Sequence, residues 1–507
     1  MTQQESNSKG LALISSETSA GHSLDEIDCA SDTPVFPLNF SEMANISKLL
    51  IKSAMPTSIT YVAEFAIGLA CLRFIGKFGT PDELAGASLG FTWANVFCLG
   101  VFNSIDQGFS IMAARLYGAG KLKELGILFQ RNLCVMGIVA IPLLFSLFFS
   151  EVILLALGLE PGVAASAGLF LRCAIPSIIG ASLFNSMRFY LISQNVFNIQ
   201  GLLVMILVPL HVFWCYLFIE VFRMSVVGAA IAKCVTDISS AVILYLYITR
   251  SEDCKESWIP WNKECMLHWF SHLKKTLLLG ANLYVEWISY EISVFIIGAL
   301  NNKFVLGAHG IAINLTIAIF TIPLGNSISM QTFMGNAIGQ GSKYKAQKFM
   351  TAGLSLNFIL TLLNVLVMLT FSQDIAFFFT NDEETMTILQ TMIIIYSLTH
   401  FADTFANHIG GILRIVGKER EVFSSYVFCY VGIAFNLQWI FGLALGHGYK
   451  AVWMCTSVGM YLMLAIMVYK LVNLNWSEEM QKLRESEALE TSLEEGMSIY
   501  IEMKEMD

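Results

Sequence analysis

The sequence predicts an all-α membrane protein with about twelve transmembrane helices in two pseudo-symmetric six-helix lobes. The first observation behind this fold class is composition, because 55% of the 507 residues are hydrophobic and only 14% are charged, with a mean hydropathy of +0.63. So few charges cannot cover the surface of a soluble protein of this length. The second is that apolar windows long enough to span a bilayer recur along the chain. The third is that the two halves carry matching motifs.

Each predicted span is a run of about 20 apolar residues, the length that a helix needs to cross the hydrocarbon core. Short polar segments separate these runs. The runs lie near 46–75, 83–114, 126–149, 163–192, 198–222, 225–249, 275–300, 304–334, 348–372, 386–414, 421–445 and 449–474. An even number of spans returns the chain to the side of the membrane on which it starts.

Matching motifs in the two halves indicate an internal duplication. The pairs are Gly86-Ala87 with Gly307-Ala308, Gly118-x-Gly120 with Gly339-x-Gly341, and Arg188/Val196-Phe197 with Arg414/Val422-Phe423. The first two pairs are 221 positions apart and the third is 226 apart, which indicates a small insertion. Six spans per copy give both copies the same orientation, so we expect parallel repeats with a substrate path between or within the lobes. Glycines at span ends also fit close helix packing and tight turns.

The predicted domain organisation follows from these repeats. We expect a six-helix N-lobe at 44–249 and a six-helix C-lobe at 273–474, joined by a cytoplasmic linker at 250–272. The Ser- and Thr-rich composition of residues 1–43 predicts a disordered cytoplasmic tail. An acidic cytoplasmic tail is expected at 475–507, where the spacing of Glu and Lys is also compatible with a surface helix.

The distribution of Lys and Arg predicts the orientation in the membrane. One set of loops carries most of these residues, namely Lys121, Lys123, Arg250, Lys255, Lys263, Lys343, Lys345, Lys348, Lys418 and Arg420. The positively charged side is expected to be cytoplasmic, so both termini should lie in the cytoplasm. Either the plasma membrane or an internal vacuolar-type membrane is consistent with this pattern. The eleven scattered cysteines contain no CxxC pair and are interpreted as small core residues rather than disulfides or metal ligands.

Carboxylates inside apolar spans are the strongest functional signal. An ionised side chain at the bilayer centre costs about 2.5–3.5 kcal/mol on insertion scales, so such acids usually face a cavity and handle ions or protons. Glu286 and Glu291 lie in the middle of one apolar stretch and, on a helix, point roughly 140° apart. In another span His400, Asp403 and Asn407 recur at i, i+3 and i+7 and form one polar stripe. We predict that Glu286, Glu291, His400 and Asp403 couple transport to protons or cations.

Six other ionisable residues within the spans are expected to pair among themselves and to fix helices, although their roles stay open. They are Glu64, Asp106, Arg115, Arg188, Lys233 and Asp237. Three prolines inside spans, Pro56, Pro176 and Pro323, are expected to kink their helices and to serve as hinges.

A series of short motifs follows a specific order through both halves. The motifs are Phe74-Ile75-Gly76-Lys77-Phe78-Gly79, Leu84-Ala85-Gly86-Ala87-Ser88-Leu89, Tyr117-Gly118-Ala119-Gly120-Lys121, Glu286-Trp287-Ile288-Ser289-Tyr290-Glu291, Ile322-Pro323-Leu324-Gly325, Gly335-Asn336-Ala337-Ile338-Gly339 and Gly411-Ile412-Leu413-Arg414. Together they resemble the multidrug and toxic compound extrusion (MATE) family, in its eukaryotic form, over roughly residues 46–474.

The resemblance implies a twelve-helix antiporter that exports organic, often cationic, compounds in exchange for protons or Na⁺. In eukaryotic relatives a seventh-span pair of glutamates, which matches Glu286 and Glu291, takes part in transport. A tenth-span His-x-x-acid pattern matches His400 and Asp403, and an eighth-span Glu of some animal members aligns with Asn314. Aromatic neighbours of the acids would add cation–π contacts to a cationic cargo. The predicted substrate-binding residues are therefore Trp287, Tyr290, Asn314, Phe401 and Asn407.

The expected function is a secondary active antiporter that exports organic, cationic compounds or xenobiotics in exchange for protons by alternating access. The alternatives are a Na⁺-coupled exporter, or a related carrier of organic anions or lipid-linked cargo. The expected partners are a small organic substrate, protons or Na⁺ and the lipid bilayer, with no nucleic acid and a monomeric chain. No HExxH, GxSxG or P-loop pattern occurs, so no enzymatic activity, cofactor or metal is expected.

Overall fold

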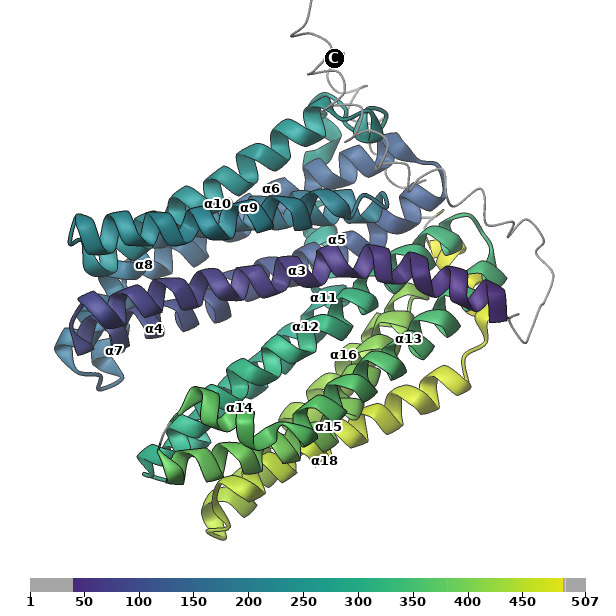
Figure 1. Cartoon of the computed structure of the whole chain (residues 1–507). Helices are drawn as coiled ribbons and strands as arrows, with labels where there is room; N and C mark the ends of the chain where they lie inside the picture. The colour runs from purple at the N-terminus through teal and green to yellow at the C-terminus, as the bar shows by residue number, and fades with distance from the viewer. Residues whose placement is uncertain (1–39, 381, 487, 489–507) are drawn as a thin grey trace, which may run out of the picture.

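The computed structural model describes residues 40–380, 382–486 and 488, and every regular element in them is helical (Figure 1). The first half contains α3 (Phe40–Phe78), α4 (Pro81–Ala94), η1 (Asn95–Leu99), α5 (Gly100–Gly118), α6 (Leu122–Phe148), α7 (Ser150–Ala156), α8 (Pro161–Ser193), α9 (Asn198–Cys215), η2 (Tyr216–Val221) and α10 (Ser225–Arg250). The segment that follows contains η3 (Glu252–Cys254) and η4 (Lys263–Met266).

The second half contains α11 (Trp269–Gly298), α12 (Lys303–Gly339), α13 (Lys343–Thr370), α14 (Ser372–Phe379), α15 (Glu383–Ile415), α16 (Glu419–Tyr426), η5 (Val427–Ala434), α17 (Phe435–Leu437), η6 (Gln438–Ala444) and α18 (Gly448–Val472). Among the described residues, 11 helices are long and apolar enough to cross a membrane. With α11, which has 30 residues, the chain has helices of spanning length at all twelve predicted positions. The predicted fold class of an all-α membrane protein with about twelve spans is therefore confirmed.

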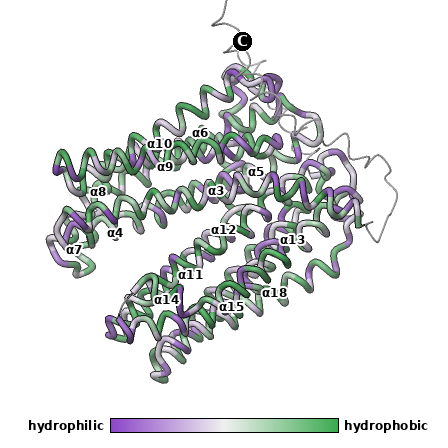
Figure 2. The backbone as a smooth tube through the Cα atoms, in the orientation of Figure 1, coloured by the Kyte–Doolittle hydropathy of each residue, from purple (hydrophilic) through white to green (hydrophobic). Residues whose placement is uncertain are grey.

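Apolar residues predominate along the helices, and hydrophilic residues gather toward the loops at either end (Figure 2). Many large apolar side chains point outward, among them Ile141, Phe145, Met205, Phe358 and Leu363. So large an apolar surface is stable where lipid replaces water, and the backbone groups in the middle of each helix are bonded within the helix.

Local sequence signals explain where several helices begin. Thr80 caps α4 by accepting a hydrogen bond from the Glu83 backbone, and the Glu83 side chain accepts from the Thr80 backbone in return. The side chains of Asn302, Ser342 and Asp382 cap α12, α13 and α15 in the same way. Each cap satisfies backbone N–H groups that the first helical turn leaves without an internal partner.

The duplication is also visible in the elements. The short helices α7 and α14, which the sequence did not predict, begin at Ser150 and Ser372, 222 positions apart, and each follows the third long helix of its half. Both lie at the end of the molecule opposite the first residues of α3 (Figure 1). Their spacing agrees with the offset of the glycine motifs.

The two halves form two groups of helices whose ribbons diverge toward the end that carries α7 and α14 (Figure 1). At the other end the halves touch. There Lys348 of α13 forms an ion pair with Glu42 of α3 at 2.7 Å. Residues 40–43 therefore belong to α3 rather than to the predicted N-terminal tail, because this ion pair and helix packing hold them. The remainder of that tail, 1–39, lies outside the described residues.

The C-terminal tail differs in part from the solvated tail that its composition favours. Residues 476–486 form a helix. Glu479 on this helix lies 3.2 Å from Lys418, and Arg484 donates to the Gly341 carbonyl at 3.0 Å. The helix is retained because it packs against the loops that follow α12 and α15. Residue 487 and residues 489–507 lie outside the described part of the chain.

Glycines line the contact between the halves. A Cβ atom on Gly118 would meet the backbone of Asn336, and one on Gly339 would meet the backbone of Arg115, so α5 and α12 approach each other through both glycines. Gly120 and Gly341, two residues further along in each motif, have φ values of +71° and +81°. The repeated Gly-x-Gly motif thus combines a close helix contact with a turn that a residue with a side chain rarely adopts.

Candidate functional site

One face of α15 carries a chain of hydrogen bonds that ends at Asp403. Tyr396 donates to Asp403 Oδ2 at 3.0 Å, and His400 Nδ1 lies 3.1 Å from the Tyr396 oxygen. Asn364 of α13 donates to His400 Nε2 at 3.2 Å and to the Ile319 carbonyl at 3.3 Å. Because Nε2 accepts, Nδ1 carries the proton of a neutral imidazole and donates to Tyr396. His400 therefore reaches Asp403 through Tyr396.

Glu286 of α11 faces Asp403 across the second half. Both side chains are buried, each 3% exposed, and their carboxyl groups lie within hydrogen-bonding reach of each other. Glu286 Oε2 and Asp403 Oδ1 are buried and receive no hydrogen bond from a donor in the described residues. A hydrogen bond between two carboxyl groups requires a proton on one of them. The pair thus contains two unfilled acceptor oxygens, and a proton held by either carboxyl group would reduce the repulsion between them.

Polar groups from other helices complete the surroundings of Glu286. The Tyr430 hydroxyl lies near Glu286, and Arg414 is near enough to attract its carboxylate. The guanidinium of Arg414 is itself tied to protein acceptors, since it donates to the Gly410 carbonyl at 3.3 Å, to the Leu279 carbonyl at 2.7 Å and to Gln331 Oε1 at 3.3 Å. Arg414 therefore supplies positive charge from a fixed position.

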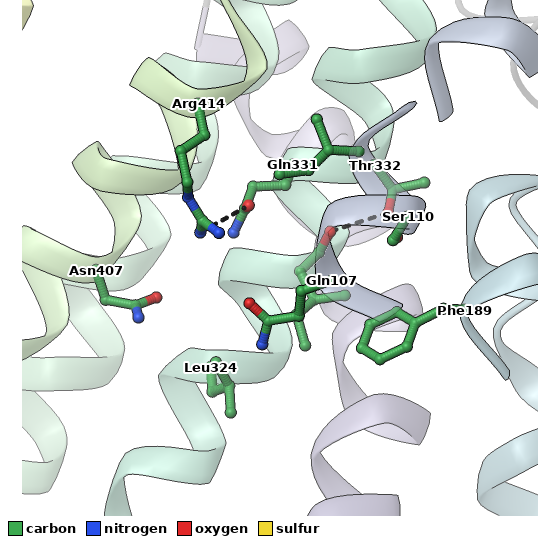
Figure 3. Close-up of a pocket in the computed structure, with 10 residues that line it drawn as sticks. Gln107, Ser110, Phe189, Leu324, Gln331, Thr332, Asn407 and Arg414 are labelled. Atoms are coloured by element: carbon green, nitrogen blue, oxygen red, sulfur yellow. Dashed lines mark hydrogen bonds between the residues drawn. The ribbon is translucent and has the colours of Figure 1, made fainter. Parts of the chain in front are cut away.

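A pocket lies between the halves, and Arg414, which is near Glu286, is one of the residues that line it (Figure 3). Its polar lining consists of Gln107, Ser110, Gln331, Thr332, Asn407 and Arg414, with Ile111, Phe189, Leu324 and Ile328 as the apolar lining. These residues come from α5 and α8 of the first half and from α12 and α15 of the second. Asn407, one turn beyond Asp403 on α15, accepts from the Ser327 hydroxyl at 3.2 Å. The predicted polar stripe of α15 thus runs from the acid pair to the pocket.

The other predicted site residues lie around this region in different ways. Tyr290 packs against the buried cluster around Tyr430, and its hydroxyl is near both Glu286 and Asp403. Phe401 is half-buried and lies between Phe358 and Phe405, with ring centroids at 5.8 and 6.3 Å.

Three predicted residues are not brought to the acid pair. Trp287 is 36% exposed on α11. Asn314 is exposed and donates to the Gly310 carbonyl of its own helix at 2.8 Å. Glu291 is half-buried, and among the described residues no contact joins it to Glu286 or Asp403. The helical period explains this separation of Glu286 and Glu291, which point in different directions from α11.

Of the six other ionisable residues named in the sequence analysis, four form two ion pairs and two form hydrogen bonds to uncharged groups. Arg188 lies 3.0 Å from Glu64, and Lys233 lies 2.8 Å from Asp237. Asp106 accepts from Asn132 Nδ2 at 2.9 Å and from the Ser186 hydroxyl at 2.7 Å. Arg115 crosses between the halves and donates to the carbonyls of Arg414 and Ile415, at 3.1 and 2.7 Å, where α15 ends.

Pro56, Pro176 and Pro323 lie inside α3, α8 and α12, as predicted. Their role as hinges stays a prediction. Pro142 and Pro209, which the sequence analysis did not single out, lie inside α6 and α9.

Sequence reasoning missed the residues that connect the acids. Tyr396 lies four and seven residues before His400 and Asp403, so the helical period could have added it to the stripe. Asn364, Gln331 and Tyr430 lie on other helices, and no sequence signal relates them to Asp403. Arg414 was noted only as part of a repeated motif.

Comparisons with known proteins agree with this architecture. The MatE family model matches the chain twice, at residues 56–217 and 279–440. Multidrug and toxin extrusion protein 1 of Danio rerio is 25% identical over 433 residues, which cover 85% of this chain and 73% of that protein. Protein DETOXIFICATION 49 of Arabidopsis thaliana is 23% identical over 461 residues, which cover 91% and 92%.

Solved structures show the same fold. The eukaryotic MATE transporter AtDTX14 matches with a TM-score of 0.81 at 18% identity, over 88% of this chain and 99% of that chain. The Vibrio cholerae MATE transporter VcmN in its bent form matches with a TM-score of 0.75 at 15% identity, over 87% and 98%.

The fold and the pocket between its halves define a multi-pass membrane transporter that is built from two copies of one helical unit. The two family matches cover both copies and more than half of the chain. The chain belongs to the MatE family.

Proposed function

We propose that this protein is a secondary active antiporter that exports small organic compounds in exchange for protons. The relatives named as multidrug and toxin extrusion proteins support export of foreign organic compounds. The observation that carries the proton part is the buried pair Glu286 and Asp403, in which Glu286 Oε2 and Asp403 Oδ1 receive no hydrogen bond from the described residues. A proton needs only these two oxygens, whereas hard metal cations need a larger shell of oxygen ligands.

In the proposed cycle the acid pair alternates between two charge states. When the pair holds a proton from outside, its negative charge falls and an organic cation is released. When that proton leaves on the cytoplasmic side, the charge returns and attracts the next cation through the pocket that Asn407 lines. Tyr396 holds Asp403 in place, and Arg414 offsets part of the negative charge that Glu286 carries in a buried site.

Orientation and location belong to the same proposal. The ends that hold the linker and the beginning of α3 carry most of the Lys and Arg, so we place both termini and the contacts between the halves on the cytoplasmic side. The ends that carry α7 and α14 then face outward or toward the lumen of a vacuolar-type compartment. The N-lobe at 44–249, the linker at 250–272 and the C-lobe at 273–474 remain the proposed units.

The test uses the full chain in vesicles with an imposed pH gradient and a fluorescent organic cation. We expect Glu286→Gln and Asp403→Asn each to lower gradient-driven flux by about 5- to 150-fold, the span of typical coupling energies. Glu151→Gln is the control, because Glu151 pairs with Arg172 at 3.0 Å away from the acid pair. Coupled flux at the native rate in both acid variants would disprove the proposed proton site.

A second candidate cargo is an organic anion, because Arg414 is the ionised side chain among the residues that line the pocket. The bonds from this guanidinium to two carbonyls and Gln331 make it less available to a ligand, so cations are our first choice. Competition by matched cationic and anionic dyes in the same vesicles separates the two. A Na⁺ gradient without a pH gradient distinguishes a Na⁺-coupled exporter from a proton-coupled one.

A further inference from the structure

A second buried polar cluster lies in the first half, away from the acid pair. The sulfur atoms of Cys71 on α3 and Cys215 on α9 lie 3.8 Å apart. His211 Nε2 lies 3.3 Å from each of them. All three residues are fully buried. His211 and Cys215 are four residues apart on one helix, so they share a face, and packing of α3 against that face adds the third residue.

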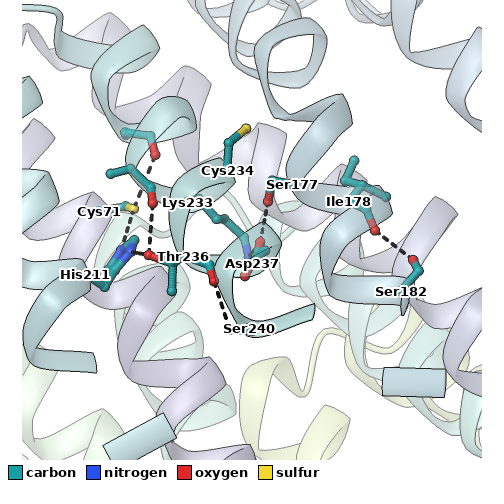
Figure 4. A network of polar contacts seen from close by, with 12 residues as sticks. Cys71, Ser177, Ile178, Ser182, His211, Lys233, Cys234, Thr236, Asp237 and Ser240 are labelled. Atoms are coloured by element: carbon teal, nitrogen blue, oxygen red, sulfur yellow. Dashed lines mark hydrogen bonds and ion pairs between the residues drawn. The ribbon is translucent and has the colours of Figure 1, made fainter. Parts of the chain in front are cut away.

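The imidazole of His211 is oriented by the next helix (Figure 4). The Thr236 hydroxyl donates to the Ala232 carbonyl at 2.9 Å, so its oxygen accepts from His211 Nδ1 at 2.8 Å. The proton therefore resides on Nδ1, and the lone pair of Nε2 points toward both sulfur atoms. Protein-bound metal ions commonly have a histidine ligand held in this way, with its second nitrogen donating to an oxygen.

The spacing of the three atoms matches a tetrahedral zinc ion. Bonds of about 2.3 Å to sulfur and about 2.0–2.1 Å to nitrogen place two sulfur ligands about 3.8 Å apart and each sulfur about 3.5 Å from the nitrogen. The observed separations are 3.8 Å and 3.3 Å. Two thiolates also cancel the charge of a divalent ion, so the complex adds no net charge to the interior, where charge is costly.

We propose that Cys71, His211 and Cys215 form a zinc site that joins α3 to α9. The ligands are the soft type found in structural zinc sites, they leave the fourth tetrahedral position to another donor, and the two thiols lose their protons to solvent as the ion binds. The Ala229 carbonyl oxygen, 3.8 Å from the Cys71 sulfur, lies beside the three ligands. This inference does not depend on the proposed transport function, and it revises the interpretation of Cys71 and Cys215 as packing residues only.

The test measures zinc in the purified full-length protein after removal of weakly held metal, followed by X-ray absorption at the zinc edge. We expect about one zinc per chain with two sulfur ligands and one nitrogen ligand. Cys71→Ala, Cys215→Ala and His211→Gln should each lose the ion. Cys134→Ala is the matched control, because Cys134 and Cys265 have the same sulfur separation of 3.8 Å but belong to no such three-ligand group in the described residues.

A further variant guards against loss of folding. Thr236→Val keeps all three ligands and removes the oxygen that orients His211. We therefore expect zinc affinity to fall by about 10- to 100-fold, while the elution volume in size-exclusion chromatography stays that of the native protein. Native protein that takes up no zinc from a competing chelator would overturn the proposal. So would equal zinc loss in Cys134→Ala, or a Cys71–Cys215 disulfide found by mass spectrometry in protein purified without reductant.

Discussion

Tyr396 is the side chain on which the geometry of Asp403 depends. The Tyr396 hydroxyl donates a hydrogen bond to Asp403 Oδ2, and the Tyr396 oxygen accepts one from His400. A buried acceptor that loses its donor costs about 1–3 kcal/mol. The neutral side chain of Tyr396 therefore influences the position and charge of Asp403 as much as Glu286 does.

We expect Tyr396→Phe to shift the pH at which proton-driven flux is half-maximal and to slow flux by about 5- to 150-fold, because about 1–3 kcal/mol of stabilisation of Asp403 is lost. Flux measured as a function of pH in vesicles checks this. Tyr190→Phe is the control, since Tyr190 is also buried and its hydroxyl bonds to Ser257 of the linker at 2.6 Å. An unchanged pH profile in Tyr396→Phe would contradict the role assigned here.

The ion pair of Glu64 and Arg188 is a separate stability element. Arg188 is 1% exposed and lies over the ring of Tyr61 at 4.6 Å, whereas Glu64 is 36% exposed. We expect Glu64→Gln to lower the free energy of unfolding by about 1–3 kcal/mol, less than for a fully buried pair, because Glu64 is 36% exposed. Thermal unfolding in detergent measures the change. If the double variant Glu64→Gln with Arg188→Gln is no more stable than Glu64→Gln alone, loss of the ion pair does not cause the destabilisation.

Between helices, the repeated glycines set how closely the halves approach. Gly339 meets the backbone of α5, whereas Gly310 on the same helix has open space around it. Both positions lie in α12, so comparing the two substitutions separates the effect of packing on stability from the effect of intrinsic helix propensity.

We expect Gly339→Ala to destabilise the contact between the halves by about 1–3 kcal/mol, because the added methyl group meets rigid backbone. Gly310→Ala should instead stabilise α12 by about 0.5–1 kcal/mol, because alanine favours helix over glycine. Melting temperatures of the two variants, measured side by side, check both signs. Equal effects of the two substitutions would show that the close approach at Gly339 is unimportant.

At the scale of the whole molecule, Arg115 joins the two halves at the end where they touch. Its guanidinium donates to the last carbonyls of α15, where a positive charge is favourable because the carbonyl dipoles of the helix point there. Glu42 and Lys348 add an ion pair at the same end. The ribbons diverge at the opposite end, so these contacts favour one of the two states of the alternating access that we propose.

We expect Arg115→Gln to shift the balance between the two states by about 2- to 30-fold, since a charge at a helix end contributes about 0.3–2 kcal/mol. A cysteine introduced at Ser110 in the pocket reports the shift, through its labelling by a membrane-impermeant reagent from each side of the vesicle. Lys121→Gln is the control, because Lys121 is exposed and pairs with Glu124 within one turn. Identical labelling from both sides in all three proteins would contradict the assignment.

The sequence by itself determined the membrane class, the twelve helices, the repeated motifs and the presence of carboxylates inside apolar spans. These follow from properties that act over one helix or less: the length of apolar runs, the cost of a charge in lipid and the period of the α-helix. For the same reason the stripe of His400, Asp403 and Asn407 was predictable. Extending this stripe by one helical turn toward the N-terminus would also have predicted Tyr396.

The tertiary structure decided which side chains meet. Glu286 lies 117 positions before Asp403, and Cys71 lies 140 positions before His211, so nothing in the local pattern could relate them. Glu291 had the same local signal as Glu286, a carboxylate inside an apolar span, but the helical period turns it in another direction. Packing of one helix face against another, which depends on the shapes of both, is the step that sequence spacing alone does not contain.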